Sequence, residues 1–174
     1  MKILKIILIT VISLTALFFI IGLFLPKTYR IERSIVVNAP DSVVYKNISD
    51  FNNFLKWNPW SKMEPSAKVD ISGPVSQPGH LYKWEGKDTG TGQMEIRKVE
   101  PLKLVDIELS FLKPFESTAN TTFQLDPNPQ GIKVTWIMQG TNKTVIEKWM
   151  GLSMGSMIGK DFEDGLQNLK ELSE

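Results

Sequence analysis

The distribution of apolar and polar residues divides the chain into one long apolar segment near its start and a longer part with alternating patterns. Residues 6–25 contain no charged side chain, and only four residues interrupt the large apolar ones, namely Thr10, Ser13, Thr15 and Gly22. A helix of this length measures about 30 Å, the thickness of the hydrocarbon core of a bilayer. The segment therefore predicts a membrane-spanning helix.

A removed signal peptide is the competing interpretation of this segment. The apolar part of a signal peptide usually runs for about 7 to 15 residues and ends at a small-x-small cleavage site. Here the run is longer and leads into Pro26-Lys27 without such a site. A core helix is the third interpretation, but the remaining 149 residues would have to cover it on every side. We therefore expect an uncleaved anchor at residues 1–27 and one soluble domain at residues 28–174.

The charges beside the anchor do not decide its orientation. Lys2 and Lys5 precede the apolar run, and Lys27, Arg30 and Arg33 follow it. Because a very short leading tail is easily left behind during insertion, we expect a single-pass protein of the cell membrane with its domain outside the cytoplasm.

Alternating apolar and polar positions after the anchor predict a sheet of about seven strands. The first pattern covers residues 29–37, and two short helical segments follow near residues 41–48 and 50–57. Turns rich in proline, glycine and asparagine separate six further alternating patterns, at residues 67–72, 81–85, 92–100, 102–111, 116–126 and 132–138. Successive strands joined by short turns pair antiparallel.

The period changes to that of a helix in the last part of the chain. From about Val145 to Leu172, apolar residues recur on one side and polar residues on the other. Together these elements predict an α+β fold in which a curved antiparallel sheet wraps around a long C-terminal helix. One helix cannot fill the concave face of seven strands unless large side chains intrude, so an internal cavity is physically allowed.

Composition excludes several kinds of chemistry. The chain has 20 basic and 19 acidic residues, which gives no electrostatic footprint for a nucleic acid. It contains no cysteine and a single histidine, so disulfides, thiolate nucleophiles, cysteine-type zinc clusters and multi-histidine zinc sites are excluded. Gly90-Thr91-Gly92 is not a phosphate loop, because it lies in a hairpin region rather than before a helix. We expect no metal and no cofactor.

Several short motifs, in this order of elements, resemble those of the START-like or SRPBCC superfamily, and more narrowly of its bacterial polyketide cyclase/dehydrase branch. They are Asn38-Ala39-Pro40, Trp57-Asn58-Pro59-Trp60, Tyr82-x-Trp84-x-Gly86, Gly90-x-Gly92, Pro114-Phe115, Val134-Thr135-Trp136 and Gly159-Lys160-Asp161-Phe162. The resemblance covers residues 28–174. It implies a helix-grip fold with an apolar tunnel between the sheet and the C-terminal helix. The superfamily includes lipid carriers, aromatic cyclases and co-chaperones, so the fold alone does not decide the function.

Aromatic and sulfur-containing residues are the strongest candidates for a ligand-binding wall. Methionine adapts to irregular shapes, and tryptophan combines a large apolar surface with one polar donor. We expect the following residues to line a pocket for a flat or acyl-chain ligand, with plain core packing as the alternative: Trp57, Trp60, Trp84, Met94, Trp136, Met138, Met154, Met157 and Ile158.

Glycines recur every four residues in the C-terminal helix, at Gly151, Gly155 and Gly159. Each costs about 1 kcal/mol of helix stability relative to alanine, so some packing advantage should offset the loss. We expect either a close approach of the helix to the sheet or room for a ligand.

Catalytic candidates are few. His80 is the only imidazole, and it is either an acid/base group or a solvent-exposed residue at the start of a strand. Asp161, near the apolar side of the last helix, is either a buried acid or the partner of a basic residue. No convincing catalytic set emerges from these two residues.

Three functions remain open at this point. The leading hypothesis is a monomeric, membrane-tethered domain that binds a hydrophobic small molecule or lipid in a cavity between the sheet and the C-terminal helix. The second is an enzyme of cyclase or dehydrase type that uses the same cavity. The third is a cavity-free module that presents its sheet to a partner protein. The ionisable groups that face the cavity discriminate between the first two.

Overall fold

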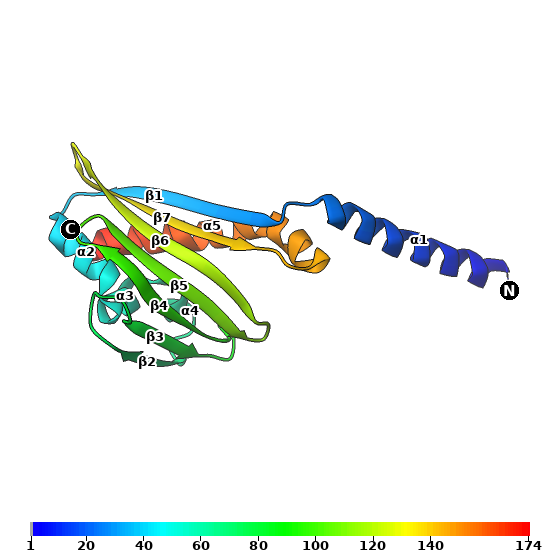
Figure 1. The fold of residues 1–174 in the computed structure, drawn as a ribbon, viewed down its shortest axis with the longest axis horizontal. Helices are drawn as coiled ribbons and strands as arrows, with labels where there is room; N and C mark the ends of the chain where they lie inside the picture. The colour runs from blue at the N-terminus through cyan, green and yellow to red at the C-terminus, as the bar shows by residue number, and fades with distance from the viewer. Residues whose placement is uncertain (1) are drawn as a thin grey trace.

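The computed structural model describes residues 2–174 and has the predicted α+β architecture (Figure 1). Its helices are α1 (Lys2–Phe24), α2 (Asp41–Ser49), α3 (Phe51–Trp57), α4 (Pro59–Met63) and α5 (Val145–Ser173). Its strands are β1 (Thr28–Val37), β2 (Lys68–Ser72), β3 (Leu81–Glu85), β4 (Thr91–Glu100), β5 (Leu104–Lys113), β6 (Ser117–Asn128) and β7 (Gly131–Thr141). The seven strands and the long last helix agree with the sequence pattern.

The strands form one open antiparallel sheet in the order β1-β7-β6-β5-β4-β3-β2. Strands β2 to β7 pair with their neighbours along the chain. The last strand, β7, also pairs with the first strand, β1. In that last pairing Thr28 lies opposite Thr141, and Val37 lies opposite Ile132. The pairing therefore places the end of α1 at the same end of the sheet as the start of α5.

One face of the sheet forms the core together with the helices. The burial of β4 and β5 alternates along each strand, and their inward residues include Met94, Ile96, Ile107 and Leu109. Helix α5 reaches this core through Phe162, whose ring stacks on Trp136 with the centroids 3.9 Å apart and the planes 7° apart. The alternating burial of β4 and β5 is the period of two that predicted the strands.

The C-terminal half of α5 packs more closely than its N-terminal half. Phe162, Leu166 and Leu169 are each at most 1 % exposed. A Cβ atom at Gly165 would come within 2.9 Å of the Trp136 ring, so the helix approaches the sheet closely at that glycine. By contrast, Met150 and Met157 are more than half exposed.

Two of the three glycines at every fourth position make room for side chains rather than for a ligand. A Cβ at Gly151 would press on the Asn142 amide, and one at Gly159 would collide with the Arg33 guanidinium. Nothing lies near Gly155. Close approach is therefore the explanation at two of the three positions, and none of the three faces the cavity described below.

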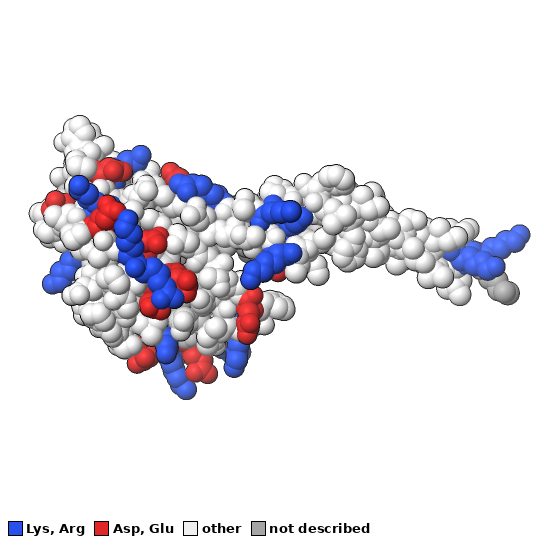
Figure 2. Space-filling model, viewed as in Figure 1, with Lys and Arg blue, Asp and Glu red and all other residues white. Residues whose placement is uncertain are grey.

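Helix α1 projects away from the domain (Figure 1) and is long and apolar enough to cross a membrane. Figure 2 shows charged side chains over the domain and at the N-terminal end of α1, with an uncharged surface between them. The start of α5 holds the other end of α1. The Lys148 ammonium, 7 % exposed, donates to the backbone carbonyls of Gly22 and Leu23 at 3.3 and 3.1 Å.

Candidate functional site

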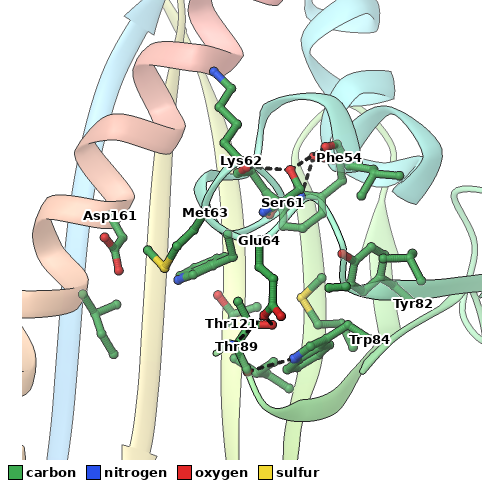
Figure 3. Close-up of a pocket in the computed structure, with 18 of the residues that line it drawn as sticks. Phe54, Ser61, Lys62, Met63, Glu64, Tyr82, Trp84, Thr89, Thr121 and Asp161 are labelled. Carbon is green, nitrogen blue, oxygen red and sulfur yellow. Dashed lines mark hydrogen bonds between the residues drawn. The ribbon is translucent and has the colours of Figure 1, made fainter. Parts of the chain in front are cut away.

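A cavity of about 720 Å³ lies between the sheet, the α3–α4 segment and α5 (Figure 3). This volume is within the usual range for pockets that bind small molecules. Strands contribute Trp84, Met94 and Trp136 to its wall, and helices contribute Trp60 and Ile158. The wall is mostly apolar because these residues occupy the inward positions of the alternating pattern.

The protein itself uses the polar atoms of two of these tryptophans. The Trp136 indole N–H donates to Thr121 Oγ1 at 2.9 Å, and the Thr121 hydroxyl in turn donates to the Ile137 carbonyl at 3.0 Å. The Trp84 indole N–H donates to the Thr89 carbonyl at 3.2 Å. Both rings are thereby fixed in orientation, and neither N–H group remains available to a ligand.

Glu64 ties the segment after α4 to the β3–β4 hairpin at the edge of the cavity. Glu64 is 8 % exposed, and its carboxylate accepts the backbone N–H groups of Lys87, Asp88 and Thr89 at 2.7, 3.1 and 2.8 Å. It also accepts the Thr89 hydroxyl at 2.7 Å. A side chain at Gly86 would collide with this carboxylate. The turn residues therefore form a cradle of donors for one negative charge.

This cradle determines the protonation of Glu64. Hydrogen bonds from Thr89, first from its backbone and then from its side chain, and from Lys87 and Asp88 lower the pKa of Glu64 to about 2. Hydrogen bonds to the charged form favour it over the neutral acid. At neutral pH Glu64 is thus an ionised group that holds the hairpin in place, with no proton to give.

Three polar groups on buried or half-buried wall residues have no hydrogen-bond partner within residues 2–174. They are the Tyr82 hydroxyl, the Trp60 indole N–H and the Asp161 carboxylate. Burial raises the pKa of Tyr82 above its ordinary value, so the phenol keeps its proton at neutral pH. Figure 3 shows Tyr82 and Asp161 on opposite sides of the cavity.

The structure places six of the nine predicted ligand-binding residues at the cavity: Trp60, Trp84, Met94, Trp136, Met138 and Ile158. Trp57 lies in the core, fully buried, and its indole N–H donates to the Asn47 carbonyl at 2.8 Å. Met154 is half-buried against the core outside the cavity wall, and Met157 is 69 % exposed. A helix turns about 100° per residue, so Met157 and Ile158 point in different directions.

His80 has neither of the two placements considered from the sequence. It is 1 % exposed and lies outside the cavity wall, so it is not a solvent-exposed residue at a strand start. Its Nε2 accepts the Phe51 backbone N–H at 3.0 Å, which leaves Nδ1 to donate to the Ser72 carbonyl at 3.1 Å. The ring also stacks on Phe51 with centroids 4.7 Å apart. His80 is therefore a structural link between α3 and the β2–β3 connection.

Sequence reasoning missed Glu64, Thr121 and Tyr82. Glu64 sits in a loop before Pro65, where a carboxylate is usually solvated, and nothing in the sequence indicates that a hairpin 23 residues later binds it. A signal for Tyr82 did exist. It lies two positions before Trp84, and the period of two puts both residues on the same face of β3.

The carboxylate of Glu64 gives the fold a specific pH dependence. A pKa lowered in the folded state stabilises the fold above the ordinary pKa of about 4.5, and this stability is lost as the pH falls towards 2. We expect Glu64→Gln to lower the melting temperature at pH 7 and the difference from wild type to shrink as the pH falls from 5 to 2.

Thermal melts of the full chain in one detergent over this pH range measure the effect. The exposed Glu116 makes no hydrogen bond in the described part of the chain, so Glu116→Gln is the matched control and should follow wild type. A pH-independent gap between Glu64→Gln and wild type would contradict the assignment.

Solved structures share this fold at low sequence identity. Protein SA2116 from Staphylococcus aureus, of unknown function, gives a TM-score of 0.63 at 11% identity, covering 84% of this chain and 93% of that one. The di-domain ARO/CYC StfQ from the steffimycin biosynthetic pathway gives 0.61 at 11% identity, covering 84% and 51%. DynU16 from the dynemicin biosynthetic locus gives 0.60 at 15% identity, covering 82% and 46%. The chain thus spans about half the length of the last two, and these likenesses establish the fold alone.

Comparison with curated proteins gives no match. The family model described as "Polyketide cyclase / dehydrase and lipid transport" matches residues 28–174, which is the whole chain after the apolar helix and its short link. The match agrees with the helix-grip arrangement of sheet and α5 and with the motifs that resemble the START-like superfamily. The chain therefore belongs to the polyketide cyclase/dehydrase and lipid transport family.

Proposed function

We propose that this protein binds a hydrophobic small molecule or lipid in the cavity between the sheet and α5, with residues 6–25 as its membrane anchor and residues 28–174 as its ligand-binding domain. The observation that carries the proposal is the cavity of about 720 Å³ with its wall of tryptophan, phenylalanine, methionine and leucine. The family description, which includes lipid transport, supports the same class of ligand. A domain filled to its centre would have supported the interaction module instead.

The ionisable groups near the cavity favour binding over catalysis. His80 lies outside the wall, and Glu64 is ionised and held by four donors. Asp161 and Tyr82 face the cavity from opposite sides (Figure 3), so they do not form a contacting acid and base. A cyclase function is the second candidate, and the presence of these two free groups in one cavity is the observation in its favour.

The position of the cavity along the sheet suits exchange of a ligand with a bilayer. Wall residue Met138 lies opposite Ile31, three positions from the pair Thr28 and Thr141 where the anchor enters the sheet. At the opposite end of this strand pair the Val37 side chain is fully buried. Anchoring also raises the effective concentration of the domain near lipid.

Only Gly22 of helix α1 is buried, and the large apolar side chains from Ile3 to Phe24 are exposed. Exposed apolar surface on this scale marks a membrane or protein contact. A single membrane span accounts for this surface, and we place the domain outside the cytoplasm.

The orientation can be measured because the chain has no cysteine. Val75 is 49 % exposed in the β2–β3 connection, so Val75→Cys provides a single thiol on the domain. We expect a membrane-impermeant maleimide to label this variant in intact cells. Labelling that occurs only after the cells are lysed would place the domain in the cytoplasm.

Filling the cavity from α5 tests the binding site. Ile158 is half-buried in the wall, and Ile158→Trp adds a large side chain into the space where the ligand would lie. We expect the fraction of protein that carries a co-purified small molecule to fall by about tenfold, because overpacking opposes ligand entry. Native mass spectrometry of the full chain released from detergent measures this fraction.

Met157→Trp is the matched control for this experiment. It adds the same side chain one residue earlier on the same helix, where the side chain is exposed. This variant should carry as much ligand as wild type. Recovery of wild type entirely without ligand, or equal occupancy in Ile158→Trp, would count against the proposed site.

A further inference from the structure

The Tyr82 side chain is buried in the cavity wall, but its hydroxyl faces open space and makes no hydrogen bond within residues 2–174. Tyr82 is 6 % exposed and belongs to the cavity wall. No hydrogen bond to its hydroxyl forms within residues 2–174, yet no fully enclosed side-chain polar atom there is left unpaired, so open space reaches this oxygen. In Figure 3 the ring of Tyr82 lies beside β3 with its oxygen turned towards the cavity.

Neighbouring aromatic rings hold Tyr82 in this orientation. Phe51, Phe54 and Trp84 lie with their ring centroids 6.0, 6.1 and 6.2 Å from that of Tyr82. Phe51 is itself fixed by His80, which accepts its backbone N–H and stacks on its ring. The hydroxyl is therefore pre-positioned, and a ligand does not have to order it.

Tyr82 differs in this respect from the other polar groups deep in the wall. Thr121, Trp136 and Trp84 all bond within the protein, whereas Tyr82 does not. Met63 and Asp161 also border the cavity but are less buried, since Met63 is 62 % exposed and Asp161 on α5 is half-buried. Tyr82 is only 6 % exposed, so a molecule that fills the cavity brings its inner part to Tyr82.

We propose that the ligand of this cavity is an apolar molecule that carries a carbonyl or hydroxyl oxygen at its inner end, and that this oxygen accepts a hydrogen bond from Tyr82. The inference rests on the proposed ligand-binding function. A pure hydrocarbon in the same place would leave the hydroxyl desolvated and unpaired, which disfavours its binding. The protonated phenol supplies the donor, so the matching group on the ligand is an oxygen acceptor.

The substitution Tyr82→Phe tests this proposal with two probes of the same shape. They are 2-acetylanthracene, which has a carbonyl oxygen, and 2-isopropenylanthracene, in which a CH₂ group replaces that oxygen. We expect Tyr82→Phe to weaken binding of the ketone about 5- to 10-fold and to leave binding of the hydrocarbon within about twofold. Native mass spectrometry of the full chain in one detergent measures both affinities, and partitioning of each probe into detergent cancels between the two proteins.

Tyr45→Phe, a tyrosine on α2 outside the cavity wall, is the control and should bind both probes as wild type does. Equal weakening of both probes by Tyr82→Phe would reduce Tyr82 to a packing role and overturn the proposal. Unchanged ketone binding would overturn it as well. If neither probe binds wild type, the proposed cavity function itself fails, and the ligand class fails with it.

A second inference comes from the contact between α1 and the start of α5. The Trp149 ring stacks on Phe18 with centroids 5.1 Å apart, and its indole N–H donates to the Phe18 carbonyl at 3.2 Å. Val145 lies against Gly22, where a side chain would collide with it. Phe18 precedes the last residue of the apolar run by seven positions, or about 10 Å along a helix. The first turns of α5 therefore run beside the part of α1 that we assign to the bilayer.

The exposed surface of these turns is apolar. Ile146, Met150 and Leu152 are 59, 54 and 57 % exposed. The hydroxyls of Ser153 and Ser156 donate to backbone carbonyls three residues earlier, which leaves them little need for water. The Lys148 ammonium donates hydrogen bonds to carbonyls in the last turn of α1. A cation is favoured there by the helix dipole.

We infer that residues 145–157 of α5 lie in the lipid headgroup and upper acyl region of the same bilayer that α1 spans. The inference rests on the proposed anchoring. Tryptophan is enriched at this depth because its ring is apolar and its N–H is polar. On α5 the cavity wall begins at Ile158, so the ligand site starts directly after the segment that we place at the membrane surface.

Single-cysteine variants of the full chain test this placement in vesicles of phosphatidylethanolamine and phosphatidylglycerol at 3:1. We expect a nitrobenzoxadiazole label at Leu152→Cys to emit at shorter wavelength than the same label at Val75→Cys and to be quenched by doxyl-labelled lipid. Flotation with the vesicles reports anchoring separately. Protein that floats but carries a water-like label at position 152 would overturn the interfacial placement, and protein that does not float would overturn the anchoring together with it.

Discussion

The contact of Phe162 with Trp136 determines where α5 leaves the sheet, and the cavity depends on that point. On the C-terminal side of the stack the helix packs tightly, because Gly165 lets its backbone approach the Trp136 ring. On the N-terminal side Gly159 and Gly151 approach Arg33 and Asn142, whereas Ile158 and Asp161 border the cavity. A single helix covers only part of a concave sheet of seven strands. The packed half supplies stability, and the other half supplies the site.

Polar groups within the core are arranged so that almost all of them are satisfied by the protein. Thr121 receives the N–H of Trp136, and the β3–β4 hairpin surrounds the carboxylate of Glu64. Each of these bonds fixes a wall element, so the cavity has a defined shape before any ligand enters. The Tyr82 hydroxyl differs from these groups, because it faces the open cavity and makes no hydrogen bond within residues 2–174.

Helix α5 contacts both α1 and the cavity of the domain. Its first turn holds the end of α1 through Lys148 and Trp149, its middle borders the cavity at Ile158, and its last turns complete the core at Leu169. A displacement of the first turn of α5 relative to α1 would therefore be transmitted along α5 to the cavity wall. In this arrangement α1 and the cavity are joined by one helix rather than belonging to two independent modules.

The sequence by itself determined the elements and most of the fold. Periods of two and of about 3.6 predicted seven strands and the last helix, the uncharged run at residues 6–25 predicted α1, and the inward alternation found wall residues such as Trp84 and Met138. Only the tertiary structure decided that Trp57 lies in the core, that His80 is a structural link, and that Glu64 is bound by a distant hairpin. Periodicity reports which face of an element is buried. It carries no information on which buried side chains contact each other across different elements. Those contacts decide which polar groups find hydrogen-bond partners and where a cavity remains.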